Sequence, residues 1–594
     1  MEISSALGTP KGSSTHPRPE KFFFGSPARA SGCPAARMST SSSSSTPLSS
    51  TTSKIAEGNS SLSSIVPTPD RTSEEGDDSP DYRSTGLVPR TLNDHCRIYL
   101  EDQLYVHALE LANSLLTSGP ALRNGRPNPA LVLPPTQIAF INNLIIHPKH
   151  TSRPDTAERR EIATLALTYL ENLMEEVGPV NANLVAAFQF NHNYSPRPRA
   201  PRNFSLDDDG FDDDFGDDGS DEENGRIMTR LGSDESIWNC GNDFWSVVGW
   251  AFNCSVAHPA RWRWWRIWLD FMLRVLEEDW SARVSKDMAA DAQRIGGGDF
   301  QFDSMRKSLV AMYSTQKSGR TNPAKWIMKA LFADGQQSSL SQFGEVFPME
   351  TRDPPRGQKR KRERELDLDN FEYADYGDTE DELEDSTGAE DAPASLSTRA
   401  SRMNTERDPD KFEHYAENEE AIRALVPFRL RTLALLSQLA YSMPLLFIHV
   451  ESLHEEFALA MKELPLPLFA AMVNPTENPL VAVEYYAVLL KELLRLFLPP
   501  RALDPAKVDD AADKSLRLTQ GMIEKCYAPH AAETSSVEDN AKLSILVESA
   551  LMFAFESGQL TGSTALREAV TSGVEARTRK AKVRRRGEGP RDRV

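Results

Sequence analysis

Apolar residues recur every three or four positions over most of the chain between residues 91 and 571, in segments separated by Pro, Gly or Asn. This period is typical of amphipathic helices, whereas the strict alternation that marks strands is almost absent. In "TLNDHCRIYLEDQLYVHALELANSLLTSG", which begins at Thr91, the period runs to Leu116 and stops at Ser118, Gly119 and Pro120. The pattern predicts an all-α fold.

The helical period is grouped into blocks that are joined internally by short turns. In the first block, helices are also expected at 134–148 and 154–179, the second with Thr156 as N-cap and Gly178 beyond its end. Short turns between helices of this length predict an irregular helical-hairpin array, either solenoid-like or a multi-helix bundle. We find no fixed repeat period, so no named repeat is supported. The three predicted blocks are 89–193, 235–348 and 409–572.

Four other segments lack the helical period and are expected to be disordered. Residues 1–88 are rich in Ser, Thr and Pro; 194–234 and 349–408 are acidic, the latter with a basic run; 573–594 is a basic tail. Eleven acidic residues lie within 205–224 alone, and like charges at this density repel one another. The predicted array is therefore interrupted by long acidic and Ser/Pro-rich segments.

The densest apolar segment, 259–280, contains five tryptophans. On a helix that starts at Pro259, two apolar rows flank a narrow polar stripe, and a helix with so wide an apolar arc is surrounded by neighbours. Because eight of the nine tryptophans lie between 238 and 280, we expect this segment to hold together the helical blocks before and after the acidic insert at 194–234. The predicted core residues are Trp262, Trp264, Trp265, Trp268, Leu269 and Met272.

A functional alternative exists for the same tryptophans. Arg261, Arg263 and Arg266 interleave with them, and an aromatic and basic platform is what single-stranded nucleic acid stacks on. Insertion into a membrane surface is a weaker alternative, since the lysine-rich face that it needs is missing. We favour core packing, because leucine and methionine share the face of Trp262 and Trp265.

Composition and cysteine spacing indicate the cellular compartment of the protein. The formal charge is −20, from 87 acidic and 67 basic residues, and the excess lies in a few runs. Five cysteines show no framework spacing, which favours a reducing, intracellular location. The most apolar stretch, 433–450, is broken by polar residues, so neither a transmembrane helix nor a membrane partner is expected, and a secretory signal is not expected either.

Candidate chemistry is sparse. Cys240, Cys254 and His258 offer three zinc ligands without a fourth partner, so buried free cysteines are the better interpretation and no metal is predicted. The glycines of "IGGGDF" at 295–300 match no phosphate-binding motif. Since no catalytic constellation occurs, we expect neither an enzyme nor a cofactor.

Charged and phosphorylatable motifs are more informative. "KRKRER" at 359–364 resembles a classical monopartite nuclear localisation signal, which an importin would bind. Ser26 and Ser79 precede prolines as proline-directed kinase sites do, and Ser220 and Ser233 resemble acidic-directed sites. The signal would rest on Lys359, Arg360, Lys361 and Arg362. The residues that could contact nucleic acid are Arg577, Arg579, Lys580, Lys582, Arg584, Arg585 and Arg586.

These features favour a non-enzymatic nuclear scaffold or adaptor that acts through protein–protein interaction in a chromatin, DNA-maintenance or transcription complex and is tuned by phosphorylation. One alternative is a DNA- or RNA-binding protein that uses its basic carboxyl-terminal tail. Another is an acidic chaperone that binds histones. Loss of DNA binding on deletion of 577–586 would favour the first alternative, and loss of histone binding on deletion of 206–223 the second.

Overall fold

The computed structural model describes residues 82–118, 122–123, 126–154, 157–190, 227–294, 300–315, 322–351, 409–474, 483–515 and 517–587. The chain divides into two compact units. The smaller comprises Met1–Asp81 and Gln293–Gln301, within which Arg294 donates a hydrogen bond to Gln301 (3.1 Å). The larger comprises Tyr82–Ala292 and Phe302–Val594 and contains the helices and strands given below.

The larger unit begins with helices and four very short strands. In order they are β1 (Thr85–Leu87), α1 (Arg90–Glu101), α2 (Tyr105–Thr117), β2 (Leu122–Arg123), β3 (Arg126–Pro127), β4 (Ala130–Val132), α3 (Pro135–Ile146), η1 (Pro148–His150), α4 (Ala157–Glu176), α5 (Gly178–Asn181) and α6 (Leu184–Ala187). Strand β1 pairs in parallel with β4, Thr85 opposite Ala130, and β2 pairs antiparallel with β3.

Helices make up the rest of the larger unit. The central elements are α8 (Ile237–Cys240), α9 (Phe244–Ala257), α10 (Pro259–Ala292), η2 (Met305–Lys307), α11 (Leu309–Thr315), α12 (Pro323–Leu331) and α13 (Gln337–Gln342). The later elements are α14 (Pro409–Glu417), α15 (Glu419–Arg423), α16 (Val426–Ser442), α17 (Val450–Lys462), α18 (Leu466–Val473), α19 (Val483–Phe497), η3 (Pro505–Lys507), α20 (Asp510–Lys514), α21 (Gln520–Met522), the π-helix η4 (Ile523–Tyr527), α22 (Val537–Glu556) and α23 (Thr564–Gly587).

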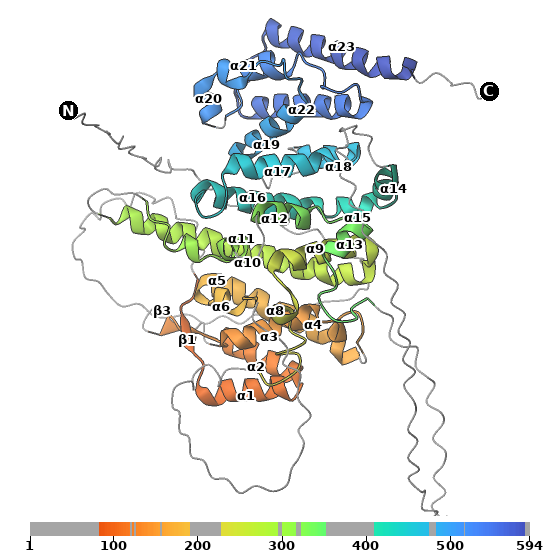
Figure 1. Cartoon of the computed structure of the whole chain (residues 1–594). Coiled ribbons are helices and arrows are strands. Elements are labelled where there is room, and N and C mark those ends of the chain that lie inside the picture. The colour runs from red at the N-terminus through yellow and green to blue at the C-terminus, as the bar shows by residue number, and fades with distance from the viewer. Residues whose placement is uncertain are drawn as a thin grey trace, which may run out of the picture. The chain divides into compact units, whose positions relative to one another are not determined.

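Within this unit the helices are stacked largely in sequence order, from α1 at one end to α23 at the other (Figure 1). Helices α2 and α3 pack on α4, α9 packs on α10 and α12, α17 packs on α19, and α22 packs on both α19 and α23. The predicted all-α array of helical hairpins is confirmed. Most of these helices bury apolar residues against neighbouring layers, as expected for solenoid-like packing.

Helix α10 joins the early and late layers. Its 34 residues begin at Pro259, as predicted, and it contacts α3 and α5 on one side and α16 on the other. Those partners come from before and after the two long segments at 191–226 and 352–408 that lie outside the described residues. The expectation that the tryptophan-rich segment holds the blocks before and after the acidic insert together is confirmed for this unit, and the contact with α16 adds the third block.

The predicted core residues of α10 are partly confirmed. Trp265, Trp268, Leu269 and Met272 are at most 1% exposed. In contrast, Trp262 and Trp264 are partly exposed, so assigning them to the core was wrong. Both flank the exposed polar stripe of the helix: the Trp262 ring packs edge-on against Phe252 and Phe428, and Trp264 lies beside exposed Arg263.

The first block starts earlier than predicted. Residues 82–88 were assigned to the disordered tail, yet β1 lies there and Arg83 is anchored from several sides. Its guanidinium donates to the carbonyls of Leu116 (3.1 Å) and Asn128 (3.0 Å) and pairs with Glu176 (3.1 Å). These partners are far away in sequence, so no local pattern could reveal them.

The second block extends beyond both predicted boundaries. Ile227 and Leu231, assigned to the acidic insert, are 6% exposed, and Glu350, assigned to the following insert, is 1% exposed. The third block also extends further, because α23 continues the helix from the predicted boundary at 572 to Gly587. The expected disorder of 1–81, 194–226, 352–408 and 588–594 lies outside the described residues, as do Ser26, Ser79, Ser220, Lys359, Arg360, Lys361 and Arg362.

Candidate functional site

The buried carboxylate of Glu350 accepts hydrogen bonds from three side chains. The indole N–H groups of Trp265 (2.8 Å) and Trp250 (3.0 Å) and the Nε of Arg261 (2.5 Å) all donate to it. Glu350 follows α13, while its partners belong to α9 and α10. A buried carboxylate is tolerated only when it is paired and hydrogen-bonded in this way.

Arg261 extends this cluster to the first block. It is 3% exposed, and besides Glu350 it donates to the Thr151 hydroxyl (2.7 Å) and to the carbonyl of Ile146 (2.8 Å). Ile146 is the last residue of α3. One arginine therefore connects α3, the turn after η1, the start of α10 and the end of the second block.

Cationic side chains that donate to the carboxyl end of a helix to which they do not belong recur through the unit. The last carbonyls of a helix lack partners within the helix and carry partial negative charge, so a cation satisfies both needs. The described pairs are Arg83 with Leu116 (3.1 Å), Arg261 with Ile146 (2.8 Å), Arg429 with Leu331 (2.7 Å), Lys542 with Lys462 (2.8 Å) and Arg577 with Ala528 (3.2 Å). We call these contacts the cationic caps.

The most enclosed cationic caps are those of Arg429 and Lys542, both 0% exposed. The Arg429 guanidinium lies 5.0 Å from the ring centroid of Phe332, and burial lowers its pKa to about 10. The Lys542 ammonium also forms an ion pair with Glu538 (3.1 Å) and lies 5.3 Å from the Phe469 ring. Both cations thus lie between layers, where they stabilise the stack and are withdrawn from solvent.

The alternative role of the tryptophans as a nucleic-acid platform is not supported by this geometry. Trp265 and Trp268 are 0% exposed, and the indole of Trp268 donates inward to the Asn142 side chain (2.9 Å). A stacking platform needs ring faces that water and bases can reach. Of the tryptophans in the predicted core, Trp262 and Trp264 retain some such surface, because both are partly exposed.

The cysteine and histidine candidates lie apart from any metal-binding geometry within the described ranges, where no group of three or more His, Cys, Asp or Glu side chains could hold an ion. Cys254 is buried, and burial raises its thiol pKa well above the ordinary value. Burial likewise raises the thiol pKa of Cys240 to about 11. A thiol that resists ionisation is a poor ligand, because metals bind the thiolate.

Two of the basic residues predicted to contact nucleic acid form hydrogen bonds within the protein itself. Arg577 is 4% exposed and donates to the carbonyls of Ala528 (3.2 Å) and His530 (2.9 Å), while Lys580 donates to those of Ala532 (2.5 Å) and Glu533 (2.6 Å). Burial lowers the Arg577 pKa. These two residues hold α23 to the loop after η4. Arg579 is exposed, and the helix backbone continues through Lys582, Arg584, Arg585 and Arg586.

Gly573 explains why α23 can approach that loop. A Cβ atom at this position would lie 1.8 Å from the carbonyl oxygen of Ala528. We therefore expect G573A to weaken the docking of α23, which hydrogen exchange or limited proteolysis of residues 564–587 will detect as faster exchange or cleavage. The matched control is S572A, at the exposed neighbouring position. Equal protection in both variants would contradict the close approach.

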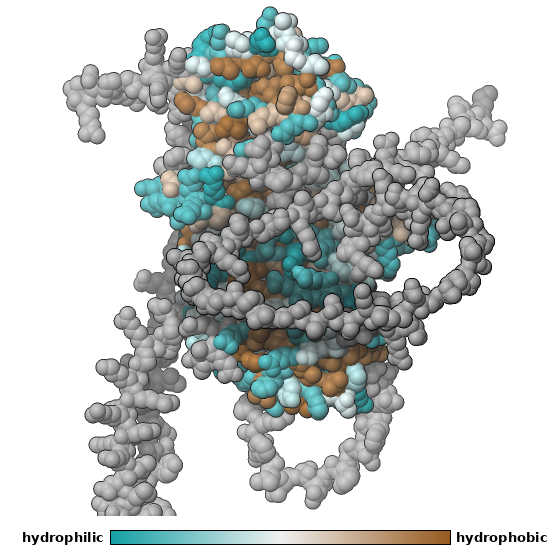
Figure 2. Space-filling view, turned by 180° about the vertical axis from the view of Figure 1, so that it is seen from behind, coloured by the Kyte–Doolittle hydropathy of each residue, from teal (hydrophilic) through white to brown (hydrophobic). Residues whose placement is uncertain are grey.

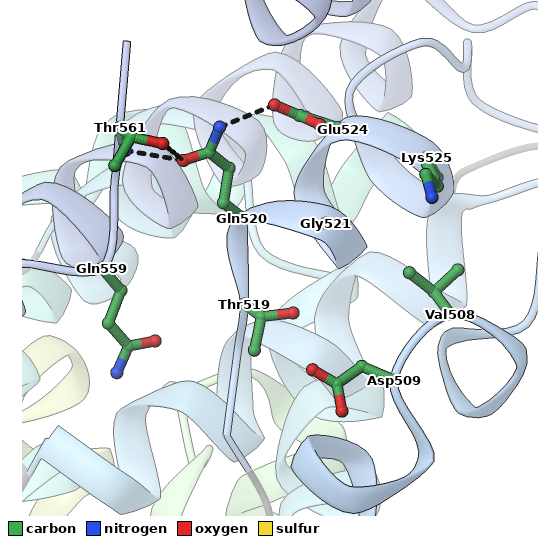
Figure 3. Close-up of a pocket in the computed structure, with 9 residues that line it drawn as sticks. All are labelled: Val508, Asp509, Thr519, Gln520, Gly521, Glu524, Lys525, Gln559 and Thr561. Atoms are coloured by element: carbon green, nitrogen blue, oxygen red, sulfur yellow. Dashed lines mark hydrogen bonds between the residues drawn. The ribbon is translucent and has the colours of Figure 1, made fainter. Parts of the chain in front are cut away.

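An open polar depression lies between α21 and the segment that follows α22 (Figure 3). Gln520 accepts from the backbone and hydroxyl of Thr561 and donates to Glu524 (2.7 Å). Hydrogen bonds from Gln520 and Ser563 lower the Glu524 pKa. Asp509 accepts from the Ala512 backbone (3.0 Å) at the start of α20. Gln520 and Glu524 therefore link this region to the segment after α22, and Asp509 caps α20.

Of the predicted phosphorylation sites, only Ser233 lies within the described residues. It is partly buried in the turn before α8, and its hydroxyl donates to the carbonyl of Thr229 (2.8 Å). The next residues include Glu235, which pairs with Lys149 (2.7 Å) and Arg230 (3.4 Å). A phosphate on Ser233 would therefore require this turn to open.

The fold and these contacts define an all-α stack of helical hairpins whose layers are tied by buried polar groups. No family model, no curated protein and no solved structure matches the chain. Within the described residues, no helix is both long enough and apolar enough to span a membrane.

Proposed function

We propose that the protein is a non-enzymatic nuclear scaffold or adaptor that acts through protein–protein interaction in a chromatin, DNA-maintenance or transcription complex. The cationic caps are the observation that carries this proposal. They use buried or partly buried charge to fix one layer to the next, and Arg429 and Leu331 are 98 residues apart in the chain. A stack fixed in this way offers partners rigid surfaces, which is the general use of solenoid-like folds.

In this proposal, the charged segments supply the nuclear localisation signal and the sites of regulation. Lys359, Arg360, Lys361 and Arg362 form the basic run that an importin would bind, and the serine sites of the acidic and Pro-rich segments would add negative charge when phosphorylated. The basic run lies outside the described residues, and so does each of these serines except Ser233. The helical stack that binds partners and the nuclear localisation signal are then separate parts of the chain.

Two measurements on the full-length protein test the proposal. Tagged protein recovered from nuclear extract should carry a stoichiometric protein partner that survives nuclease treatment. The variant K359A/R360A/K361A/R362A should lose nuclear accumulation, whereas R399A/R402A/R407A, a control in the same segment, should keep it. A protein that is found free of partners, or whose partners leave on nuclease treatment, would contradict the scaffold.

Direct binding of nucleic acid is the second candidate, and one observation favours it: Arg579 is exposed on α23 and the basic run continues along the same helix. If this helix binds phosphates, R584A/R585A/R586A should reduce the slope of log affinity against log salt by about 0.9 for each phosphate that is no longer neutralised. R306A/K307A removes an exposed basic pair elsewhere and is the control. An equal slope in the wild type and both variants would exclude this end of α23 as the binding surface.

A further inference from the structure

Helix α22 has an outward face that the rest of the unit leaves uncovered. Its inner side packs on α18, α19 and α23. On the opposite side, Val537 is 50% exposed, Met552 36% and Phe555 71%, and Ala541 and Ile545 between them are partly exposed. These positions fall on one arc of a helix that turns 100° per residue. They form an apolar row, interrupted by Glu548, which we call the α22 stripe.

This stripe is unusual for a surface. Apolar residues also gather at this end of the stack, where α21 to α23 lie, when the unit is viewed from behind (Figure 2). A phenylalanine left mostly in water forgoes the gain of burying its ring. Contiguous exposed apolar surface of this kind marks interaction sites more often than chance exposure does.

Charge on α22 indicates what kind of partner fits. Glu548 is exposed within the stripe, and Glu556 is exposed at its edge. Lys542, the one cation of the helix, is buried on the carbonyls of Lys462 and Leu464. The outward face of α22 is therefore apolar and acidic, because the structure has used its only positive charge inside.

We propose that the α22 stripe binds an amphipathic helix of a partner protein that carries Lys or Arg beside its apolar anchors. This inference rests on the proposed scaffold function and names the chemistry of one partner. Apolar anchors at helical spacing would lie along Val537, Met552 and Phe555, as in helix-in-groove recognition. A basic side chain beside them would pair with Glu548, so that no buried carboxylate is left without a counter-charge.

The same charge disfavours other occupants. Glu548 lies near the middle of the stripe, so a second copy packed antiparallel on this face would bring two carboxylates together at the centre of the interface. An anionic membrane surface would be repelled by Glu548 and Glu556. A basic helix is the occupant that turns these carboxylates into favourable contacts.

The test uses the full-length protein and two fluorescent synthetic helical peptides. One has leucines at i, i+4, i+7 and i+11 with lysines along both edges, and the other has glutamates in place of the lysines. The lysine peptide should bind at least ten times more tightly than the glutamate peptide. M552S/F555S should abolish this binding. E548K should lower the affinity for the lysine peptide and raise the affinity for the glutamate peptide. L445S/L446S, exposed in the turn after α16, should change nothing.

The remaining outcomes each overturn the inference. Equal affinity for both peptides, or binding that M552S/F555S leaves intact, would remove the stripe as a charge-selective site. Self-association that M552S/F555S abolishes would assign the face to a second copy, and binding to anionic vesicles that the same variant abolishes would assign it to a membrane. If a stoichiometric nuclear partner stays bound to M552S/F555S while the peptide test fails, the scaffold stands and only this docking site is rejected.

Discussion

Replacing Glu350 with glutamine is expected to lower the free energy of unfolding by about 3–5 kcal/mol, the usual cost of removing one partner from a buried ion pair. The carboxylate accepts from Arg261, Trp250 and Trp265 at 2.5 to 3.0 Å and is 1% exposed. Glutamine keeps the shape but turns one acceptor into a donor facing other donors. Arg261 would stay buried without a counter-charge. Urea unfolding followed by tryptophan fluorescence will measure the loss.

Two controls make this result specific. D510N breaks the exposed pair of Asp510 and Lys514 (2.7 Å) and should change stability by less than about 0.5 kcal/mol. The double variant R261M/E350M removes both charges. Its loss of unfolding free energy should therefore be smaller than the sum of the losses for R261M and E350M. A loss for E350Q no larger than that for D510N would mean that this cluster does not tie the layers together.

Acidification is expected to destabilise the protein through three buried histidines. Burial lowers the pKa of His147 to about 3, that of His150 to about 4 and that of His454 to about 3. The unfolded chain takes up these protons near pH 6.5 while the folded chain cannot, so the stabilisation is full above pH 6.5 and is lost as pH falls toward the folded pKa values. At pH 5 each histidine should cost about 2 kcal/mol.

Buried carboxyl groups act with the opposite sign. Burial raises the pKa values of Asp279 and Glu278, so the folded state takes up these protons first and gains stability as pH falls. On acidification, the wild type therefore loses less unfolding free energy than the sum of the three histidine contributions.

A single variant separates the two effects. H454Q should reduce the difference in unfolding free energy between pH 7.5 and pH 5 by about 2 kcal/mol, because His454 is 0% exposed and bonded only to the Ser437 hydroxyl (2.8 Å) among the described contacts. H95Q, at an exposed position of α1, should keep the wild-type difference. Equal pH dependence in H454Q and the wild type would show that His454 is not held neutral.

Helical periodicity predicted the architecture well. Helix α10 starts at Pro259 as expected, and α4 ends at Glu176, just before Gly178, whose φ of 74° lies in the region that favours glycine. These features depend on residues close together in the chain. Apolar spacing and terminal residues are local signals, so they can be recognised without knowing the tertiary neighbours.

The predicted block boundaries are wrong where charged residues are held by distant partners. Arg83, Glu350 and Arg577 each lie in a segment that was assigned to solvent because its composition is polar. All three are instead held by partners elsewhere in the chain: Arg83 by Leu116, Glu350 by Trp265 and Arg577 by Ala528. The α22 stripe was missed for the complementary reason, since its apolar period looks the same whether or not a neighbour covers it.

Residue spacing along the chain is enough to predict the helical class, the positions of most helices and the tryptophan-rich segment at the centre. Which charges are buried and which apolar residues remain exposed depends instead on the packing of the layers. The physical reason is that burying a charge depends on a partner brought close by folding: Arg261 meets Glu350 across 89 residues. Apolar spacing predicts which face of a helix can be buried. Which residues contact that face depends on the neighbouring layer.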